Sequence, residues 1–262
     1  MKTRYIRLLL PVAAFLLLAL WIRATVSLDS AHCVKPKFLD GRLTDWREPY
    51  ILLAGWAWHA EEGRTPVYGG TTDCSATLRT AWDAKGLYLA IAVVDDVFRP
   101  AKMPPFDGGD CVMLRVESAV ARPGEAPAEF VVPWASPVGA YRREASGELV
   151  KATGVRIGAA RANLPLPATL PPGEAGKTPA TGLTKVWYEM MIPWSAIPGA
   201  SSAIPQALNL EMDVLDDDGD GLRGRLHWHG QPRLLHVVPG MGLVLPTTMK
   251  KIPLSPANRS AQ

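Results

Sequence analysis

Beyond residue 28 the chain is built from short apolar or alternating runs, each bounded by glycine, proline or aspartate. Such runs are typical of β-strands, whereas a surface helix needs an apolar stripe of helical period over about ten residues. No stripe of that kind occurs past the first 28 residues. With 23 glycines and 24 prolines in 262 residues, the chain is also rich in turn formers. The sequence therefore predicts an all-β protein.

The clearest local prediction is a β-hairpin. Two strand-like runs, Ala76–Trp82 and Leu87–Val94, are separated by the four residues Asp83-Ala84-Lys85-Gly86, and a short connection with aspartate and glycine is typical of hairpin loops. Many short strands favour an antiparallel β-sandwich with jelly-roll or immunoglobulin-like layers and long Pro/Gly-rich loops. Further strands are expected at 111–116, 129–132, 154–159, 185–192, 207–214, 225–228 and 234–238, with the long loops at 121–127 and 164–182.

The N-terminus has the pattern of an export signal. Three basic residues precede the apolar run Leu8–Ile22, which has the length of a signal-peptide core and is shorter than the ~20 residues of a comfortable membrane span. Residues 1–27 are therefore expected to form a hydrophobic leader helix. Two outcomes stay open: cleavage near Thr25 and Ser27, or retention as an N-terminal membrane anchor. In both cases the rest of the chain is exported, to the periplasm or outside the cell.

The charge of the exported part is close to zero. The formal net charge of the whole chain is +3, but four basic residues precede Asp29, the first acidic residue. The remainder is slightly acidic, which argues against nucleic acid as a partner. Strand signals continue across residues 37–245 with no second core, so one domain is expected there, followed by a polar tail at 246–262.

Three cysteines, Cys33, Cys74 and Cys111, allow one disulfide in an exported chain. Cys74 and Cys111 each stand at the start of an expected strand, which suits a link between strand ends. The alternative is three reduced, buried thiols.

Several short motifs follow one another in a characteristic order. The chain reads Asp40-Gly41-Arg42-Leu43-Thr44-Asp45-Trp46, then Ala81-Trp82-Asp83 and a strand ending at Asp95-Asp96, then Gly109-Asp110, Tyr188-Glu189-Met190-Met191-Ile192-Pro193-Trp194, Asp216-Asp217-Asp218-Gly219-Asp220-Gly221 and Leu226-His227-Trp228. In order and spacing these motifs resemble carbohydrate-binding module family 9 and its sugar-binding-like relatives. The resemblance implies a β-sandwich that binds a saccharide or glycan without catalysis. Two departures are a long Pro-rich insertion before Tyr188 and the lack of an attached catalytic domain.

Tryptophans are the first candidates for a sugar surface, because sugars present apolar C–H faces to flat rings. The resemblance places Trp46, Trp82 and Trp194 in motifs that define the fold, and we expect them in the core. The remaining candidates lie near loops or in polar segments. The predicted ligand-binding residues are Trp56 and Trp58, which share one face if extended, together with Trp134 and Trp228.

An aspartate-rich turn is the sharpest metal-binding motif. Asp216, Asp218 and Asp220 occupy positions 1, 3 and 5 of a calcium loop, with Gly221 at position 6. Position 12 is His227 rather than glutamate, so a plain Asp/Gly turn is the alternative. Asp95-Asp96 are expected to cap the preceding strand, or to add a ligand from a second loop.

Two further functions stay open beside sugar binding. His227 and His229, with Met113, Met190, Met191 or Met212, are candidate axial ligands for haem b, as in an electron-transfer subunit built on a related sandwich. The long insertion favours a third reading, a protein-interaction subunit of an envelope complex. No nucleophile elbow, phosphate loop or zinc-protease motif is present, so we do not expect an enzyme.

Overall fold

The computed structural model describes residues 27–53, 58–60, 71–101, 108–122, 124–134, 138–165, 182–200, 204–219, 224–228 and 233–238. The expected leader helix, the polar tail and most of the loop at 164–182 lie outside these residues. The elements are β1 (Ser27–His32), β2 (Ile51–Leu53), β3 (Trp58–Ala60), β4 (Cys74–Trp82), β5 (Gly86–Asp95), β6 (Cys111–Ser118), β7 (Ala128–Pro133), β8 (Tyr141–Arg143), β9 (Leu149–Lys151), β10 (Arg156–Leu164), β11 (Leu183–Pro193), the 3-10 helix η1 (Trp194–Ala196), β12 (Ala207–Asp216), β13 (Gly224–His227) and β14 (Arg233–Val238).

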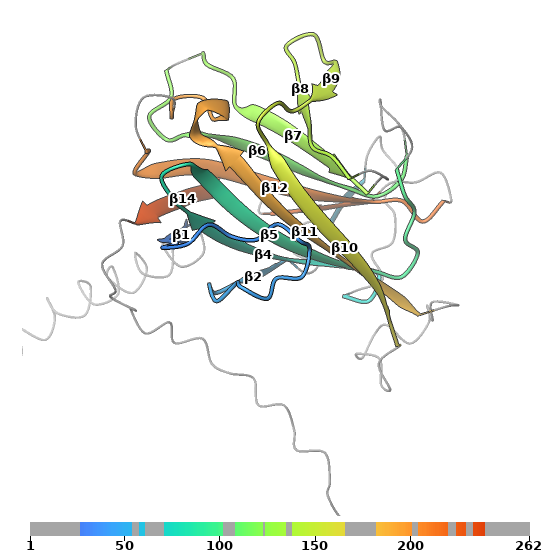
Figure 1. The fold of residues 1–262 in the computed structure, drawn as a ribbon. Helices are drawn as coiled ribbons and strands as arrows, with labels where there is room; N and C mark the ends of the chain where they lie inside the picture. The colour runs from blue at the N-terminus through green and yellow to red at the C-terminus, as the bar shows by residue number, and fades with distance from the viewer. Residues whose placement is uncertain are drawn as a thin grey trace, which may run out of the picture.

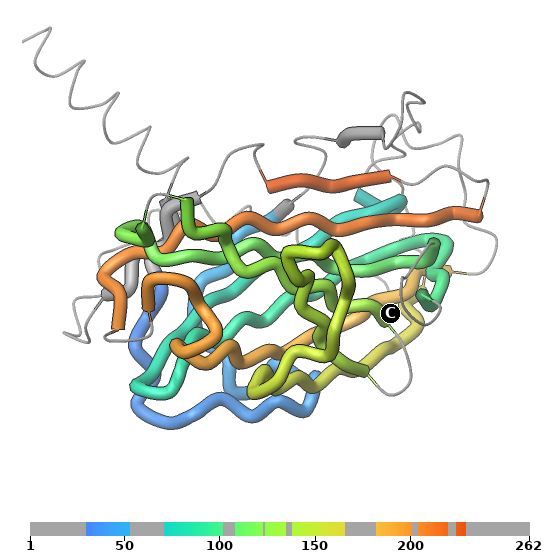
Figure 2. Tube along the Cα trace, turned by 90° about the horizontal axis from the view of Figure 1, so that it is seen from above, coloured from blue at the N-terminus to red at the C-terminus, as the bar shows by residue number. Residues whose placement is uncertain are grey.

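The strands form two packed layers. They hydrogen-bond in the order β10-β11-β5-β4-β1-β14-β12-β6-β7-β8-β9, with β13 beside β12 and β2 beside β4. This path folds over so that β10, β11, β5 and β4 make one layer, and β14, β12, β6 and β7 make the other (Figures 1 and 2). The predicted all-β sandwich is confirmed.

The core lies between the two layers. Leu78, Leu89 and Ile91 of one layer belong to the same buried cluster as Leu114 and Leu210 of the other. Each is at most 1% exposed, and full burial of such a side chain contributes about 1.5–3 kcal/mol. Along β6 and β12 buried and partly buried residues alternate, so that one face of each strand points into this core.

The predicted hairpin is present as β4 and β5. The Asp83 carboxylate accepts hydrogen bonds from the backbone N–H groups of Lys85 (2.7 Å) and Gly86 (3.2 Å) and from the Tyr88 hydroxyl (2.9 Å). The indole N–H of Trp194 donates to the Asp83 carbonyl oxygen at 2.9 Å. One aspartate thus fixes the loop and joins it to the end of β11.

The structure differs from the sequence prediction at several short strands. β2, β3, β8 and β9 have three residues each, which is too short for an alternating pattern to be recognised. β10 begins two residues later than expected, because Gly154 has a left-handed φ of +82° and lies in a turn. β1 precedes the predicted domain start at Lys37, and it pairs in parallel with both β14 and β4, whereas we expected antiparallel pairing.

The Asp40–Trp46 motif crosses the outer face of the β10-β11-β5-β4 layer and is held there by Glu189. The fully buried Glu189 carboxylate accepts hydrogen bonds from the N–H of Gly41, from the N–H of Leu43 (3.3 Å) and from the indole N–H of Trp46 (2.9 Å). A Cβ at Gly41, where φ is +76°, would overlap the β10 backbone at Ala159. The close approach therefore requires glycine.

None of the three cysteines forms a disulfide, and all three are buried. The predicted disulfide between Cys74 and Cys111 is absent, and the alternative of three buried thiols describes the structure. Burial, together with the Asp83 charge, raises the pKa of Cys33 to about 11. Within the described part of the chain, no helix is long and apolar enough to cross a membrane.

Candidate functional site

Carboxylates gather at one end of the sandwich, where four strands begin or end. Asp73 precedes β4, Asp95 ends β5, Asp110 precedes β6 and Asp216 ends β12. The pairing of Cys74 with Asp95 and of Cys111 with Leu215 brings these positions to the same edge. Because antiparallel neighbours alternate in direction, the start of one strand lies beside the end of the next.

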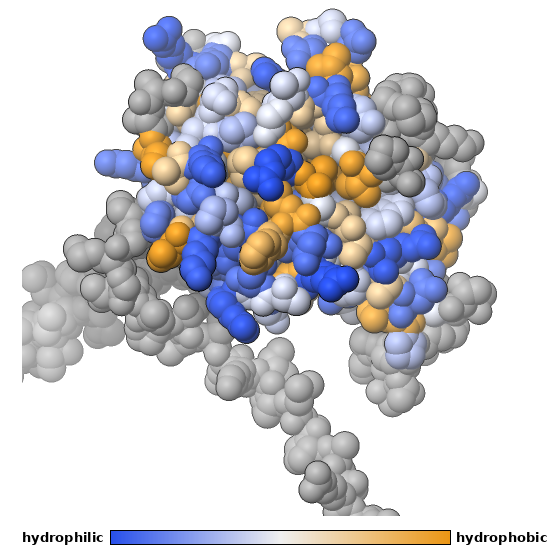
Figure 3. All heavy atoms as spheres, viewed as in Figure 1, coloured by the Kyte–Doolittle hydropathy of each residue, from blue (hydrophilic) through white to orange (hydrophobic). Residues whose placement is uncertain are grey.

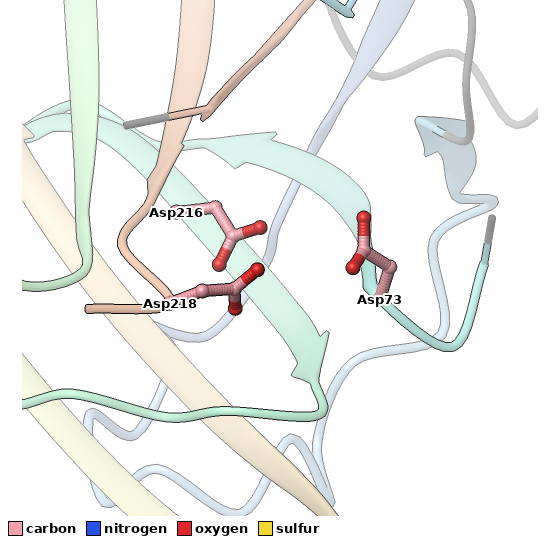
Figure 4. A group of neighbouring side chains, drawn as sticks. All are labelled: Asp73, Asp216 and Asp218. Carbon is pink, nitrogen blue, oxygen red and sulfur yellow. The ribbon is translucent and has the colours of Figure 1, made fainter. Parts of the chain in front are cut away.

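Three overlapping groups of carboxylates have oxygens within 4.8 Å of one another. They are Asp95-Asp110-Asp216, Asp73-Asp216-Asp218 and Asp95-Asp96-Asp218. The carboxylates of Asp216 and Asp218 point from the end of β12 toward Asp73 (Figure 4). We call the first group the inner triad: its members are 2%, 5% and 3% exposed. The cluster therefore extends from the solvent into the sandwich.

The inner triad is unfavourable when all its members are ionised. Burial is the main cause that raises the pKa values of Asp95, Asp110 and Asp216. The negative charges of Asp110 and Asp216 raise that of Asp95 further, and Asp218 does the same for Asp216. In the described part of the chain, no cationic side chain forms an ion pair with the inner triad. A bound proton or a bound metal cation is needed to offset this charge.

Hydrogen-bond donors satisfy only part of the triad. Asp110 accepts from the N–H of Arg99 (2.5 Å) and of Asp217 (3.0 Å), and Asp95 accepts from the N–H of Val97 (2.8 Å). The Oδ1 atom of Asp216 is buried and has no hydrogen-bond partner among the described residues. A buried carboxylate oxygen without a donor costs about 1–3 kcal/mol or more. The side-chain atoms of the cluster that could bind a metal ion are all carboxylate oxygens, which are ligands that suit Ca²⁺.

The structure brings together part of the predicted calcium loop and adds residues that the sequence did not indicate. Asp216 and Asp218 lie in the cluster, whereas Asp220 is outside the described residues. Asp95 caps β5 by accepting from the N–H of Val97 and also lies in the inner triad; its role as a metal ligand stays a prediction. Asp73 and Asp110 were missed, because only the strand pairing brings them to the loop.

Aromatic rings lie beside the inner triad. Phe98 lines a small cavity together with Asp95, Asp110 and Tyr188. The half-buried Trp134 ring contacts Phe98 and Tyr188 edge-on, with ring centroids 5.9 and 6.1 Å apart. The Arg161 guanidinium lies over Phe98, 5.3 Å from the ring centroid. Trp134 is thus the predicted ligand-binding tryptophan that the structure places near the carboxylate cluster.

Of the other predicted ligand-binding tryptophans, the structure describes the side chain of Trp228 alone, and that side chain is buried. Trp228 is 8% exposed and belongs to the main core cluster. It alternates with His227, so that its side chain faces inward together with that of Leu226. The expectation that Trp228 binds a ligand is therefore corrected to a packing role. Trp56 and the side chain of Trp58 lie outside the described residues.

His227 is engaged by carboxylates on both sides. Its Nδ1 contacts Asp213, and its Nε2 lies 3.2 Å from Oε1 of Glu211. Although burial works against ionisation, hydrogen bonds from His227 and Arg225 hold the pKa of Asp213 below its ordinary value. With both ring nitrogens engaged, His227 is poorly placed to bind a haem iron. His229 and the side chain of His236 lie outside the described residues.

Comparison with solved structures finds similar folds at low sequence identity. A family 9 carbohydrate-binding module from Caldicellulosiruptor kristjanssonii, solved with glucose, is 13% identical; the match covers 84% of this chain and 100% of the module, with a TM-score of 0.44. The same module with cellotriose gives 12% identity, 84% and 97% coverage and a TM-score of 0.44. A candidate carbohydrate-binding protein from Bacteroides uniformis is 13% identical; the match covers 81% of this chain and 99% of that protein, with a TM-score of 0.48. No protein-family model and no curated protein sequence matches the chain. The resemblance of the sequence motifs to family 9 modules stays a prediction.

Proposed function

We propose that this chain is an exported, non-catalytic domain that binds a saccharide or glycan and is stabilised by Ca²⁺ at the carboxylate end of the sandwich. The observation that carries the proposal is the inner triad, with its unpartnered Asp216 oxygen, beside the cavity lined by Phe98. Asp95, Asp110, Asp216 and Asp218 are the described residues placed to hold the ion.

The ion and the aromatic rings have different roles in this proposal. Ca²⁺ would offset the carboxylate charge and join the ends of β5, β6 and β12, because it accepts several oxygen ligands in a flexible geometry. Trp134 and Phe98 offer ring surface to the C–H face of a sugar, and Arg161 offers N–H donors to its hydroxyl groups. The order of the sequence motifs, which resembles family 9 modules, supports a sugar as the ligand.

The leader supports export of the domain, either released or tethered to the outer side of the cytoplasmic membrane. Neither haem binding nor a protein-interaction role is favoured by a contact among the described residues.

The proposal is tested by titrating the purified protein with soluble oligosaccharides, among them glucose and cellotriose, in Ca²⁺ and again in EDTA. We expect saturable binding that is stronger in Ca²⁺, and a colourless protein without a Soret band. A stoichiometric Soret band would replace the sugar-binding proposal with the haem alternative. If no glycan of a broad array binds in either Ca²⁺ or EDTA, the sugar-binding proposal is also contradicted.

A further inference from the structure

The N-terminal segment of the sandwich exposes an unusual amount of apolar surface. Among the described residues, seven large hydrophobic side chains are exposed, and four of them lie between residues 34 and 52. They are Val34 (90% exposed), Phe38 (71%), Tyr50 (48%) and Leu52 (58%). This segment lies over the outer face of the β10-β11-β5-β4 layer, where Leu39 and Leu43 pack on Met191 and Tyr88. Exposed apolar groups gathered in one region mark an interaction surface.

The same region carries a small excess of positive charge, because residues 34–52 hold four basic side chains against Asp40, Asp45 and Glu48, of which Glu48 pairs with Lys37. Lys35, Arg42 and Arg47 are exposed and form no ion pair with another described residue. Arg156 joins them from β10, since its partner in the β-sheet register is Met191, which packs beneath the segment. By contrast, arginines of the other layer are paired with carboxylates, as in Arg115 with Glu129 and Arg225 with Asp213. Hydrophilic and hydrophobic side chains are interleaved on this side of the molecule (Figure 3).

The chain enters the sandwich at the same edge. β1 pairs with β4 at Ala81 and Trp82, and β2 pairs with the same side of β4 at residues 76–78. Only residues 23–26 separate the apolar run ending at Ile22 from Ser27, the first residue of β1. A chain of that length spans at most about 17 Å. A leader kept in the membrane would therefore hold this edge close to the lipid headgroups.

We propose that this basic, apolar face, defined by Val34, Phe38, Tyr50 and Leu52 with Lys35, Arg42, Arg47 and Arg156, rests on an anionic membrane surface. The inference goes beyond sugar binding, and it rests on the proposed export and on the alternative in which the leader is retained as an anchor. Exposed apolar side chains enter the headgroup region, and arginine or lysine side chains gain from anionic lipids. With this face on the membrane, the domain has a fixed orientation relative to the bilayer.

The test uses the full chain, with its leader, reconstituted in vesicles. A fluorophore is attached at Leu52→Cys or, as a matched control, at Ser146→Cys in the exposed β8–β9 turn, which lies far from β2 (Figure 1). The three native cysteines are buried, and labelled wild-type protein gives the background. Vesicles contain a spin-labelled lipid in phosphatidylcholine, with or without phosphatidylglycerol.

With phosphatidylglycerol, we expect quenching at position 52 to exceed that at position 146 by about two-fold or more, as for a group seated among headgroups. The excess should shrink in pure phosphatidylcholine and in the Arg42→Glu/Arg47→Glu variant. Equal quenching at the two positions, or an excess insensitive to lipid charge, would overturn the proposal. Shielding of position 52 that appears only after an envelope protein extract is added would show a protein partner and overturn it as well. Saccharide and Ca²⁺ titrations on the same preparations report separately on the proposed function.

Discussion

Buried carboxylates occur at two places in this sandwich, and their surroundings are opposite. Glu189 is fully buried under the N-terminal segment, where the N–H groups of Gly41, Leu43 and Trp46 all donate to it. The inner triad of Asp95, Asp110 and Asp216 is almost as buried, yet its three carboxylates share only three N–H donors, and one oxygen of Asp216 has no partner among the described residues. Burial raises the pKa at both places.

The difference shows how the chain uses buried acids in two ways. A carboxylate that accepts three N–H donors is satisfied internally, and it holds one segment of chain against another. A cluster of carboxylates with few donors is incomplete as a folded structure and needs a proton or a metal cation. The first arrangement serves the fold, and the second points to a ligand from outside the chain.

The largest effect is expected at Glu189. In Glu189→Ala, three N–H donors, two of them in buried hydrogen bonds, lose their acceptor, and we expect the free energy of unfolding to fall by about 3 kcal/mol or more. Denaturant titration measures the loss, which should be equal in Ca²⁺ and in EDTA. Glu189→Gln keeps one acceptor oxygen and should lose less. A loss confined to Ca²⁺ would contradict the separation of the two sites.

Calcium should have the next largest effect, through the carboxylate cluster. At a free Ca²⁺ concentration 100-fold above the dissociation constant, binding to the folded state alone stabilises by about 2.7 kcal/mol. Differential scanning calorimetry should then show Tm rise by about 5–10 °C between EDTA and Ca²⁺. Mg²⁺ is the control, because it prefers a small octahedral site with several waters and should shift Tm less. Equal shifts with both ions would point to general charge screening.

Without metal, the wild-type protein should become less stable as pH rises. The folded pKa values of Asp95 and Asp216 lie above those of the unfolded chain, so the folded state binds more protons. The stability they contribute is complete below about pH 4 and is lost progressively as pH rises through the folded pKa values. Urea titrations in EDTA measure this slope, and Ca²⁺ should flatten it. A slope of the opposite sign in EDTA would contradict the account of the triad.

Saccharide binding should depend on the ring beside the cluster. We expect Trp134→Ala to weaken binding about ten-fold, the equivalent of about 1.4 kcal/mol, because the apolar face of the sugar loses its partner. The matched control is Trp187→Ala, a half-buried tryptophan on β11 that belongs to no core cluster and lies beside Lys185. Calorimetric titration with the best saccharide separates the two variants. Equal losses would move the binding site away from Trp134.

Much of the fold could be predicted from the sequence, because alternation and turn residues act locally. Ala76–Trp82 and Leu87–Val94 form the predicted hairpin, and Asp83 closes its loop. The short strands β2, β3, β8 and β9 could not be found, since three residues have no period.

The carboxylate site was only half predictable. Asp216 and Asp218 stand in a recognisable metal-binding motif, whereas Asp73 and Asp110 have no such motif around them and reach the cluster through strand pairing. Trp228 was misplaced because a tryptophan at the end of a strand has the same sequence context whether it faces the core or the solvent. The role of Glu189 was equally invisible, since its donors lie more than 140 residues away in the chain.

The most direct measurement is a calorimetric titration of Ca²⁺ into metal-free protein, for the wild type and for Asp216→Asn. We predict saturable binding to the wild type and at least a ten-fold weaker affinity in the variant, which loses one charged ligand. In EDTA the variant should be as stable as the wild type or more stable, because it removes a repelling buried charge. Unchanged Ca²⁺ affinity in Asp216→Asn, or no binding to the wild type, would contradict the assignment of the carboxylate cluster as a calcium site.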